Sequence, residues 1–427
     1  MVSISSITLS NSQLLHYFSA LTVLLISAHI FGWILSRLRL PRVVGEIIGG
    51  IVLGPTLLGF FFPDIYSFLF NAFPSEGQLI AIIYEFGLIL LMFISGFEIQ
   101  KSLTKKDGKL IGTLMVSSTA IPFIAGWLLF SFYDFSFLVG TSGNMLALQI
   151  VFATSVAITS IPVISKIFLD LGLTNTRFAK IVLGSATIHD TILYIALAIA
   201  TGLVSGAAAS GFSIAAVVIT TILFFLIALA VVPRFLELVN NSRFNLLKRS
   251  SPTGYMLFIC FLFAALAVFL QVNIMFGAFL AGISIGMMPS KSFEIEKAAI
   301  KNLSVALFIP IYFAVVGLQL DLIHHFDVLF FLAFLVASTA LEMAGTLVAA
   351  RISKLDWASS LNLAVVMNAR GGPGIVLATI AFGLGIINEN FFVTLVMCAI
   401  VTSLFAGWWL RSRVQKKAEL LTFSSHK

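Results

Sequence analysis

A histidine and an aspartate, His189 and Asp190, are adjacent near the middle of an apolar run that covers about residues 177–202. A charge in hydrocarbon is costly unless it is paired or hydrated, so such residues are functional candidates. A buried carboxylate can hold a dehydrated cation or a proton, but hardly both at once. That competition is the minimum requirement for exchanging one for the other. The alternative is a structural aspartate bonded to hydroxyls such as those of Thr187 or Thr191.

Four other charged residues stand well inside apolar runs: Glu46, Glu85, Glu342 and Arg370. Arg370 at mid-span has no route to the membrane surface, so it should face a carboxylate, for which Glu342 is the candidate, or the exposed carbonyls of an interrupted helix. Glu46 lies among small residues at four-residue spacing, which favours helix packing or a subunit interface: Gly45, Gly49, Gly50 and Gly54. We assign no functional role to Glu85.

Two runs contain residues that break helices at mid-depth. In the fifth run Pro162 removes a backbone donor, and in the twelfth Gly371, Gly372 and Pro373 can hardly remain helical. Non-helical backbone at that depth is tolerated where it lines a cavity, and interrupted helices at matching places in two halves mark the site of a secondary transporter. Two ordinary proline-kinked helices are the alternative.

These patterns give two sets of candidate site residues. We expect one set to bind the ion and the proton: Asp190, His189, Thr159 and Ser160. We expect the other set to shape the site: Arg370, Glu342, Pro162, Gly371, Gly372 and Pro373. No resident metal and no cofactor are expected, and His324 and His325 are expected in a solvated loop.

The composition indicates that these residues lie in membrane-spanning segments. Of 427 residues 59% are hydrophobic and 10% are charged, against roughly 25% charged in a soluble domain. This excludes a soluble catalytic module, a nucleotide-binding Rossmann domain and a disulfide scaffold. Cys260 and Cys398 fall in apolar runs and should be packing residues. We count thirteen runs: 14–36, 41–61, 77–97, 109–132, 144–169, 177–202, 212–236, 253–270, 274–288, 299–320, 327–350, 357–385 and 390–410.

The basic residues predict the orientation of these spans. Of the 25 lysines and arginines, 24 fall in alternate connections, toward the ends of the runs that border these connections, or in the C-terminal tail. By the positive-inside rule these segments are cytoplasmic, so the C-terminus lies inside and the N-terminus outside. The net charge of +7 is therefore an orientation signal rather than a sign of nucleic-acid binding. The first run lacks the features of a cleaved signal peptide and should be retained.

The predicted fold is an all-α polytopic membrane protein. With the seventh span as a linker, six spans lie on either side, and the odd total inverts the second half relative to the first. The interrupted fifth and twelfth spans are then the fifth of their respective halves. We therefore predict two inverted six-helix repeats with corresponding broken helices.

Six motifs in order resemble the monovalent cation:proton antiporter-2 family of sodium/proton exchangers. They are residues 45–55, 88–98, 159–172, 189–190, 276–282 and 368–371, and the resemblance covers residues 12–412. It implies a homodimer with an elevator-like mechanism in which the two broken helices cross beside the aspartate. The implied domains are dimerisation (1–97 and 251–320), core transport (98–203 and 321–412), linker helix (204–250) and a short cytoplasmic tail (413–427).

The expected function is exchange of Na⁺ or K⁺ for H⁺ in a bacterial inner membrane, serving pH homeostasis, by a protein that is not an enzyme. Many electrogenic relatives have two adjacent aspartates where this chain has His189 and Asp190, and some have a lysine in the tenth span, where 302–320 has none. One titratable carboxylate favours electroneutral exchange. A nucleotide-binding regulatory domain would need a separate subunit. A cation-coupled organic-anion symporter or a passive channel is the alternative.

Overall fold

The computed structural model describes most of residues 9–422. The exceptions are 39, 99–107, 161–162, 165–166, 169–170, 174–175, 206–213, 242–244, 271, 273, 289–292 and 417–418, and, for side chains alone, 187–191, 193, 205, 214–218, 229 and 241. This part is helical, with one isolated β-bridge between Val139 and Ile387. Ten of its helices are long and apolar enough to cross a membrane, and three apolar helices are shorter. The all-helical membrane class is confirmed, whereas thirteen spans and inverted repeats remain predictions.

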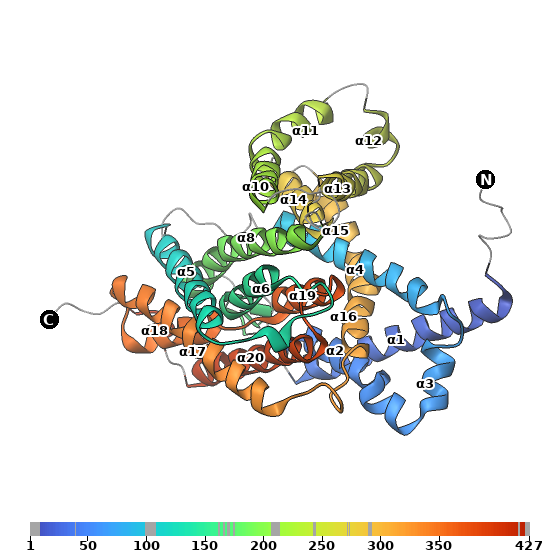
Figure 1. Ribbon diagram of the computed structural model, residues 1–427. Helices are drawn as coiled ribbons and strands as arrows, with labels where there is room; N and C mark the ends of the chain where they lie inside the picture. The colour runs from blue at the N-terminus through green and yellow to red at the C-terminus, as the bar shows by residue number, and fades with distance from the viewer. Residues whose placement is uncertain are drawn as a thin grey trace. The chain divides into compact units, whose positions relative to one another are not determined.

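Two compact units divide the chain, residues 1–91 with 298–324 and residues 92–297 with 325–427. The first unit holds α1 (Asn11–Arg37), α2 (Arg42–Leu53), the π-turn η2 (Pro55–Gly59), α3 (Pro63–Phe70), most of α4 (Glu76–Glu98), the end of α15 (Glu294–Leu303), the π-turn η6 (Ser304–Phe308) and α16 (Ile309–Leu318). In it α1, α2 and α16 pack on one another (Figure 1).

The glycine spacing of the second predicted span serves this packing. A Cβ atom added at Gly45 would lie 2.3 Å from the carbonyl oxygen of Phe31 on α1. On the other face of α2, a Cβ atom at Gly50 would lie 1.9 Å from the carbonyl oxygen of Ala314 on α16. Glycine is needed at both positions because two backbones touch there.

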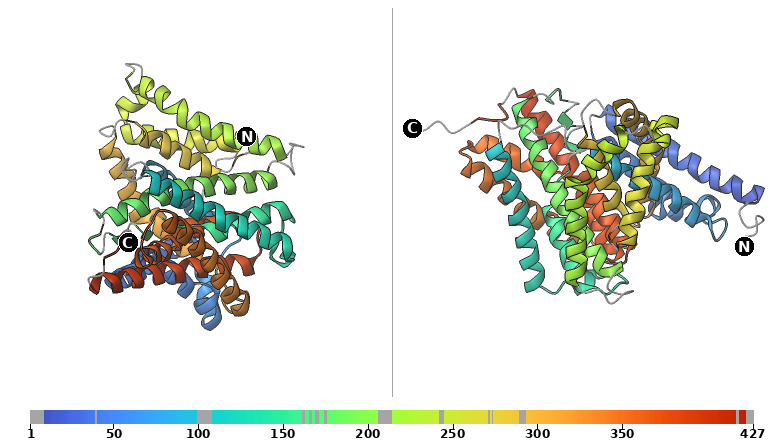
Figure 2. Two further views of the ribbon diagram at one scale, coloured as in Figure 1. Left: turned by 90° about the vertical axis from the view of Figure 1, so that its left-hand side faces the viewer. Right: turned by 90° about the horizontal axis from the view of Figure 1, so that it is seen from above.

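The second unit contains the remaining helices. They are α5 (Gly108–Phe132), the 3₁₀ turn η5 (Ser136–Leu138), α6 (Met145–Ala157), α8 (Arg177–Ser205), α10 (Ile214–Ala230), α11 (Val232–Asn241), α12 (Leu246–Ser250), α13 (Pro252–Phe269), α14 (Ile274–Gly286), α17 (Val328–Ile352), α18 (Trp357–Met367), α19 (Gly371–Gly383) and α20 (Glu389–Gln415). Figure 2 shows α5 and α8 side by side, and both pack on α6.

Polar caps at helix starts fix the elements that carry the site. Asn144 accepts a hydrogen bond from the amide of Ala147 in α6, Asp356 from that of Ser359 in α18, and Asn388 from that of Phe391 in α20. Such caps satisfy amide groups that the first helical turn leaves without partners. The loops before α6 and α20 also bond to each other, through the Gly140 amide and the Ile386 carbonyl at 3.1 Å.

Candidate functional site

The described residues show a helix end within each of the two runs for which an interruption is predicted. In the fifth run α6 ends at Ala157, and the backbone of Ile158 is extended. In the twelfth run α18 ends at Met367, three residues lie outside the helices, and α19 begins at Gly371. Gly372 and Pro373 follow in the first turn of α19, where the missing N–H of a proline removes no intrahelical hydrogen bond. The glycine–proline sequence therefore begins a second half-helix.

The two interruptions touch each other inside the second unit. The Thr159 hydroxyl donates to the carbonyl oxygen of Met367, the last residue of α18, at 2.7 Å. Gly371 has a φ of +30°, and a Cβ atom there would lie 2.6 Å from the Ser160 hydroxyl oxygen and 2.3 Å from a methyl carbon of Val163. Thr159 and Ser160 are both fully buried. Non-helical backbone from two distant parts of the chain thus meets at one buried place.

Replacing Gly371 with alanine is expected to force these two segments apart, because the new methyl group has no space and the positive φ disfavours it. We expect a loss of about 1–3 kcal/mol of stability and a clear loss of transport. Gly372→Ala is the matched control, since a Cβ atom there would meet nothing within 4 Å. Melting temperatures in detergent check the pair. Equal values for the two variants would contradict the described contact.

Arg370 lies between α18 and α19 and is 2% exposed. Its Nη1 group donates to the carbonyl oxygen of Ser155 at 3.0 Å. Ser155 belongs to the last turn of α6, whose carbonyls have no intrahelical partner and carry the negative end of the helix dipole. The guanidinium therefore caps the half-helix that ends at the other interruption. Its Nε and Nη2 groups have no hydrogen-bond partner among the described residues.

Glu342 is completely buried in the middle of α17. One carboxyl oxygen lies 3.3 Å from the Thr159 hydroxyl, and the other has no partner in the described part of the chain. Glu342 and Arg370 are both described, and their side chains form no direct ion pair. Of the two partners expected for Arg370, the structure shows the helix-end carbonyl rather than the carboxylate.

The side chains of two predicted site residues, Asp190 and His189, are not described, and Pro162 lies outside the described residues altogether. Helix α8 is continuous through positions 189 and 190 and packs against α6, α18 and α19. Position 190 lies one helical turn from Ala186 and one from Tyr194, and both of these are buried. The backbone of α8 thus passes the elements that form the two interruptions.

Sequence reasoning missed two residues at the twelfth-run interruption, both from α20. The Thr402 hydroxyl accepts a hydrogen bond from the Arg370 amide at 3.3 Å, and the Ser403 hydroxyl accepts one from the Gly371 amide at 3.2 Å. These amides begin α19 and have no partner in their own helix. The available signal was the adjacent hydroxyl side chains of Thr402 and Ser403 within the run 390–410.

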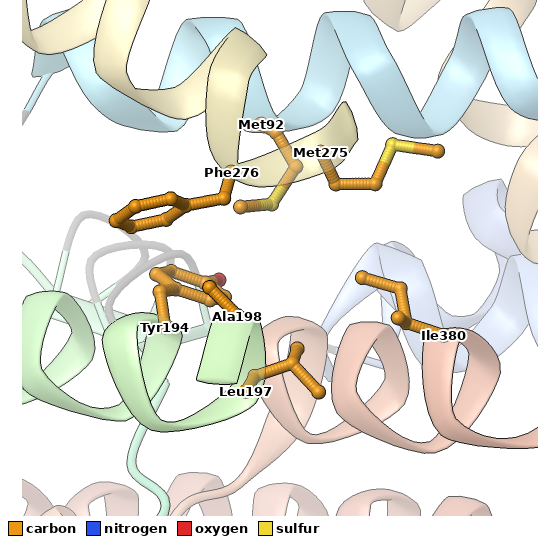
Figure 3. Close-up of a pocket in the computed structure, with 7 residues that line it drawn as sticks. All are labelled: Met92, Tyr194, Leu197, Ala198, Met275, Phe276 and Ile380. Carbon is orange, nitrogen blue, oxygen red and sulfur yellow. The ribbon is translucent and has the colours of Figure 1, made fainter. Parts of the chain in front are cut away.

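A small cavity lies in the second unit (Figure 3). Its lining comes from α4, α8, α14 and α19: Met92, Tyr194, Leu197, Ala198, Met275, Phe276 and Ile380. Only the Tyr194 hydroxyl among these side chains offers an oxygen, whereas Na⁺ and K⁺ need several. The cavity is therefore a poor cation site. No group of three or more histidine, cysteine or acidic side chains with metal-binding geometry occurs among the described residues.

The buried interruptions offer hydroxyl, carboxylate and carbonyl oxygens together with one guanidinium. Hard monovalent cations bind such oxygens, and half-helix ends coordinate ions in secondary transporters. No described side chains form a nucleophile and base pair there. The arrangement suits ion binding rather than covalent chemistry.

Comparison with known proteins agrees with this chemistry. The model of the family described as "Sodium/hydrogen exchanger, transmembrane" matches residues 25–416. The K⁺/H⁺ antiporter 1 of Saccharomyces cerevisiae is 29% identical over 86% of this chain and 43% of its own length. The Na⁺/H⁺-K⁺ antiporter GerN of Bacillus cereus is 26% identical over 91% of this chain and 94% of its own. The chain spans about half the length of the first three curated relatives it matches.

A solved structure shows the same fold. The sodium proton antiporter MjNhaP1 from Methanocaldococcus jannaschii matches with a TM-score of 0.69 and 15% identity, over 95% of this chain and 99% of that one. Members of the matched family are transporters rather than enzymes, and Na⁺ or K⁺ and H⁺ are their cargo, with no cofactor. Because the family model covers nearly all of its length, the chain belongs to the sodium/hydrogen exchanger family.

Proposed function

We propose that this chain exchanges Na⁺ or K⁺ for H⁺ by alternating access, with Asp190 holding the cation and the proton in turn. The observation that carries the proposal is the contact between the two interruptions, where Thr159 bonds to Met367 and Ser160 meets Gly371. Secondary transporters bind their ions at such broken helices. Helix α8, which carries Asp190, packs against both parts of this region.

Each residue of the site has a distinct role in this proposal. Asp190 supplies the charge that both ions need, and Thr159 and Ser160 supply neutral oxygens. His189 stays neutral beside the cation, since a second positive charge there is unfavourable. Arg370 and Glu342 keep the two interruptions in register through their contacts with Ser155 and Thr159.

The remaining architecture of the proposal comes from the sequence. The core segments 98–203 and 321–412 move against the dimerisation segments 1–97 and 251–320 of a homodimer. The N-terminus lies outside and the C-terminus in the cytoplasm of a bacterial inner membrane, since basic residues gather in alternate connections. The names of the relatives include both K⁺ and Na⁺, so each cation is tested separately.

Electroneutral exchange is the expected result in proteoliposomes. If Asp190 carries one proton or one monovalent cation, the loaded site has the same charge in both directions. An imposed potential, worth about 2.3 kcal/mol per elementary charge at 100 mV, should then leave cation-driven proton flux unchanged. Flux is measured on adding Na⁺ and K⁺ separately, with and without a clamped potential.

A flux that rises several-fold with the potential would reject one-for-one exchange. Loss of that rise in His189→Gln would identify His189 as a second proton carrier. No cation-driven proton flux with either ion would reject the antiporter itself. Empty liposomes under the same gradients are the control for proton leak.

A further inference from the structure

Two adjacent hydroxyl side chains of α20 meet the start of the half-helix α19. The amide of Arg370 donates to Oγ1 of Thr402 at 3.3 Å, and the amide of Gly371 donates to Oγ of Ser403 at 3.2 Å. Thr402 is 4% exposed and Ser403 is fully buried, so little water competes for these bonds. Two successive amides at the start of α19 are thus held by two successive residues of α20.

The single hydrogen of each hydroxyl is used inside α20. Thr402 donates to the carbonyl oxygen of Cys398 at 2.8 Å, and Ser403 donates to that of Ala399 at 2.6 Å. A hydroxyl has one hydrogen and two lone pairs, so both oxygens meet α19 as acceptors only. This matches what α19 lacks, because the first amides of a helix have no partner within it.

Few other donors remain at this end of α19. Pro373 has no N–H, and the Gly374 amide donates to the carbonyl oxygen of Arg370 at 3.0 Å. Between residues 370 and 374, the Gly372 amide is therefore the one donor without a partner in the described part of the chain. Free amides give a helix start a partial positive charge, which disfavours a neighbouring cation. The hydroxyls of α20 thus offset a feature that opposes cation binding.

The two residues that α20 holds also contact the interruption of the fifth run. A Cβ atom at Gly371 would lie 2.6 Å from Oγ of Ser160, so the position of Gly371 sets the space for that hydroxyl. Arg370 donates through its side chain to the carbonyl oxygen of Ser155 at 3.0 Å. Each α20 hydroxyl thus lies one residue away from the fifth-run interruption.

We propose that Thr402 and Ser403 are positioning residues for cation binding: their hydroxyl oxygens hold the start of α19 where Gly371 leaves the Ser160 oxygen free for the ion. The proposal rests on the proposed function, in which Ser160 is a ligand of the cation. Without Ser403 the Gly371 amide needs another acceptor, and the Ser160 oxygen is a neighbour of Gly371. An oxygen that accepts such a bond has one lone pair fewer for a cation.

Substitutions that nearly conserve volume remove the acceptors. Thr402→Val and Ser403→Ala lose the hydroxyl together with its bond inside α20, whereas Thr402→Ser keeps both. Thr394→Val is the matched control. Thr394 lies on the same helix, is fully buried and donates to the carbonyl oxygen of Asn390 at 2.8 Å, but among the described residues no amide of another helix donates to it. The control therefore loses the internal bond alone.

The first measurement is hydrogen–deuterium exchange of the segment 370–374, followed by mass spectrometry on the full chain in detergent. It does not depend on transport. Loss of one hydrogen bond should speed exchange of the freed amide about fivefold in Thr402→Val and in Ser403→Ala. Thr402→Ser and Thr394→Val should exchange like the wild type.

The second measurement is cation-driven proton flux in proteoliposomes as a function of Na⁺ and K⁺ concentration. The apparent KM for the transported cation should rise about fivefold in Ser403→Ala and in Thr402→Val, with the maximal rate changed by less than about twofold. A merely structural role would lower the number of active molecules, and so the maximal rate, without this change in KM. Thr394→Val and Thr402→Ser should keep the wild-type KM.

Each outcome decides the proposal. Wild-type exchange of 370–374 in both Ser403→Ala and Thr402→Val overturns it, because the hydroxyls would then not hold α19. Faster exchange with an unchanged KM also overturns it, since the hydroxyls would then be structural only, and so does an equal rise of KM in Thr394→Val. Absence of cation-driven flux in the wild type itself would reject the proposed function and, with it, the role in cation binding. Wild-type flux with an unchanged KM in the variants rejects the positioning role alone.

Discussion

Replacement of Asp190 by asparagine is expected to abolish cation-dependent proton movement while leaving a folded protein. An amide has nearly the shape of a carboxylate but can neither take up a proton near neutral pH nor balance the charge of a dehydrated cation. Proton flux in everted vesicles, measured after adding Na⁺ and K⁺ separately, should fall to the level of vesicles that lack the protein. The melting temperature and the size-exclusion profile in detergent should show a folded molecule.

Asp134→Asn is the matched control for this substitution. Asp134 lies in the loop after α5 and accepts a hydrogen bond from the Ser136 amide at 2.9 Å, a bond that asparagine can also accept. Its flux should equal that of the wild type. Retention of more than about a tenth of the wild-type rate in Asp190→Asn, a barrier change below about 1.4 kcal/mol, would contradict the mechanism. Glu342, the buried carboxylate beside Thr159, would then be the candidate for the group that holds the cation and the proton in turn.

The sequence was sufficient for the all-helical membrane class and for the ends of several helices. Apolar runs bounded by charges and by Gly or Pro place helix ends closely, as in the run 109–132 and the observed α5, Gly108–Phe132. Membrane spans favour this kind of prediction, because the bilayer fixes both their length and the need for internal backbone hydrogen bonds. The interruption of the twelfth run was predictable for the same reason, since adjacent glycines and a proline act on the backbone locally. Pro162, on which the prediction for the fifth run depends, lies outside the described residues.

Contacts between the interruptions were not predictable from one sequence. Thr159 bonds to Met367, and Ser403 bonds to Gly371. The first pair is separated by about half the chain, and nothing in either local pattern specifies the other partner. The contact between His29 of α1 and the carbonyl oxygen of Ala306 in η6 could not be predicted either. Such contacts depend on how helices pack in three dimensions.

Arg370 shows why charge matching alone could not decide between the two partners expected for it. A buried arginine suggests a carboxylate, but the end of a helix also carries partial negative charge on its free carbonyls. Here the half-helix α6 ends beside Arg370 and offers the Ser155 carbonyl at 3.0 Å. An interrupted helix therefore provides carbonyl partners for a buried arginine even where no acidic residue lies nearby in the sequence.

Replacement of Arg370 by alanine is expected to cost both stability and transport. It removes a charge-assisted hydrogen bond, worth about 1.5–3 kcal/mol, and leaves unfilled space at a residue that is 2% exposed. The helix end at Ser155 loses its cap as well. Arg370→Lys should rescue poorly, because it lacks the planar fork of donors. The melting temperature in detergent checks both variants, and an unchanged value would argue that Arg370 faces water.

A double variant distinguishes the two possible roles of Arg370. If the guanidinium mainly balances the charge of Glu342, then Glu342→Gln should restore the stability lost in Arg370→Ala, because no uncompensated carboxylate remains. If it mainly caps α6, the neutral glutamine cannot replace the bond to Ser155, and the double variant should stay as unstable as the single one. Since the structure shows the bond to Ser155 and no direct ion pair with Glu342, we expect no recovery. Full recovery of the melting temperature would assign Arg370 to the carboxylate instead.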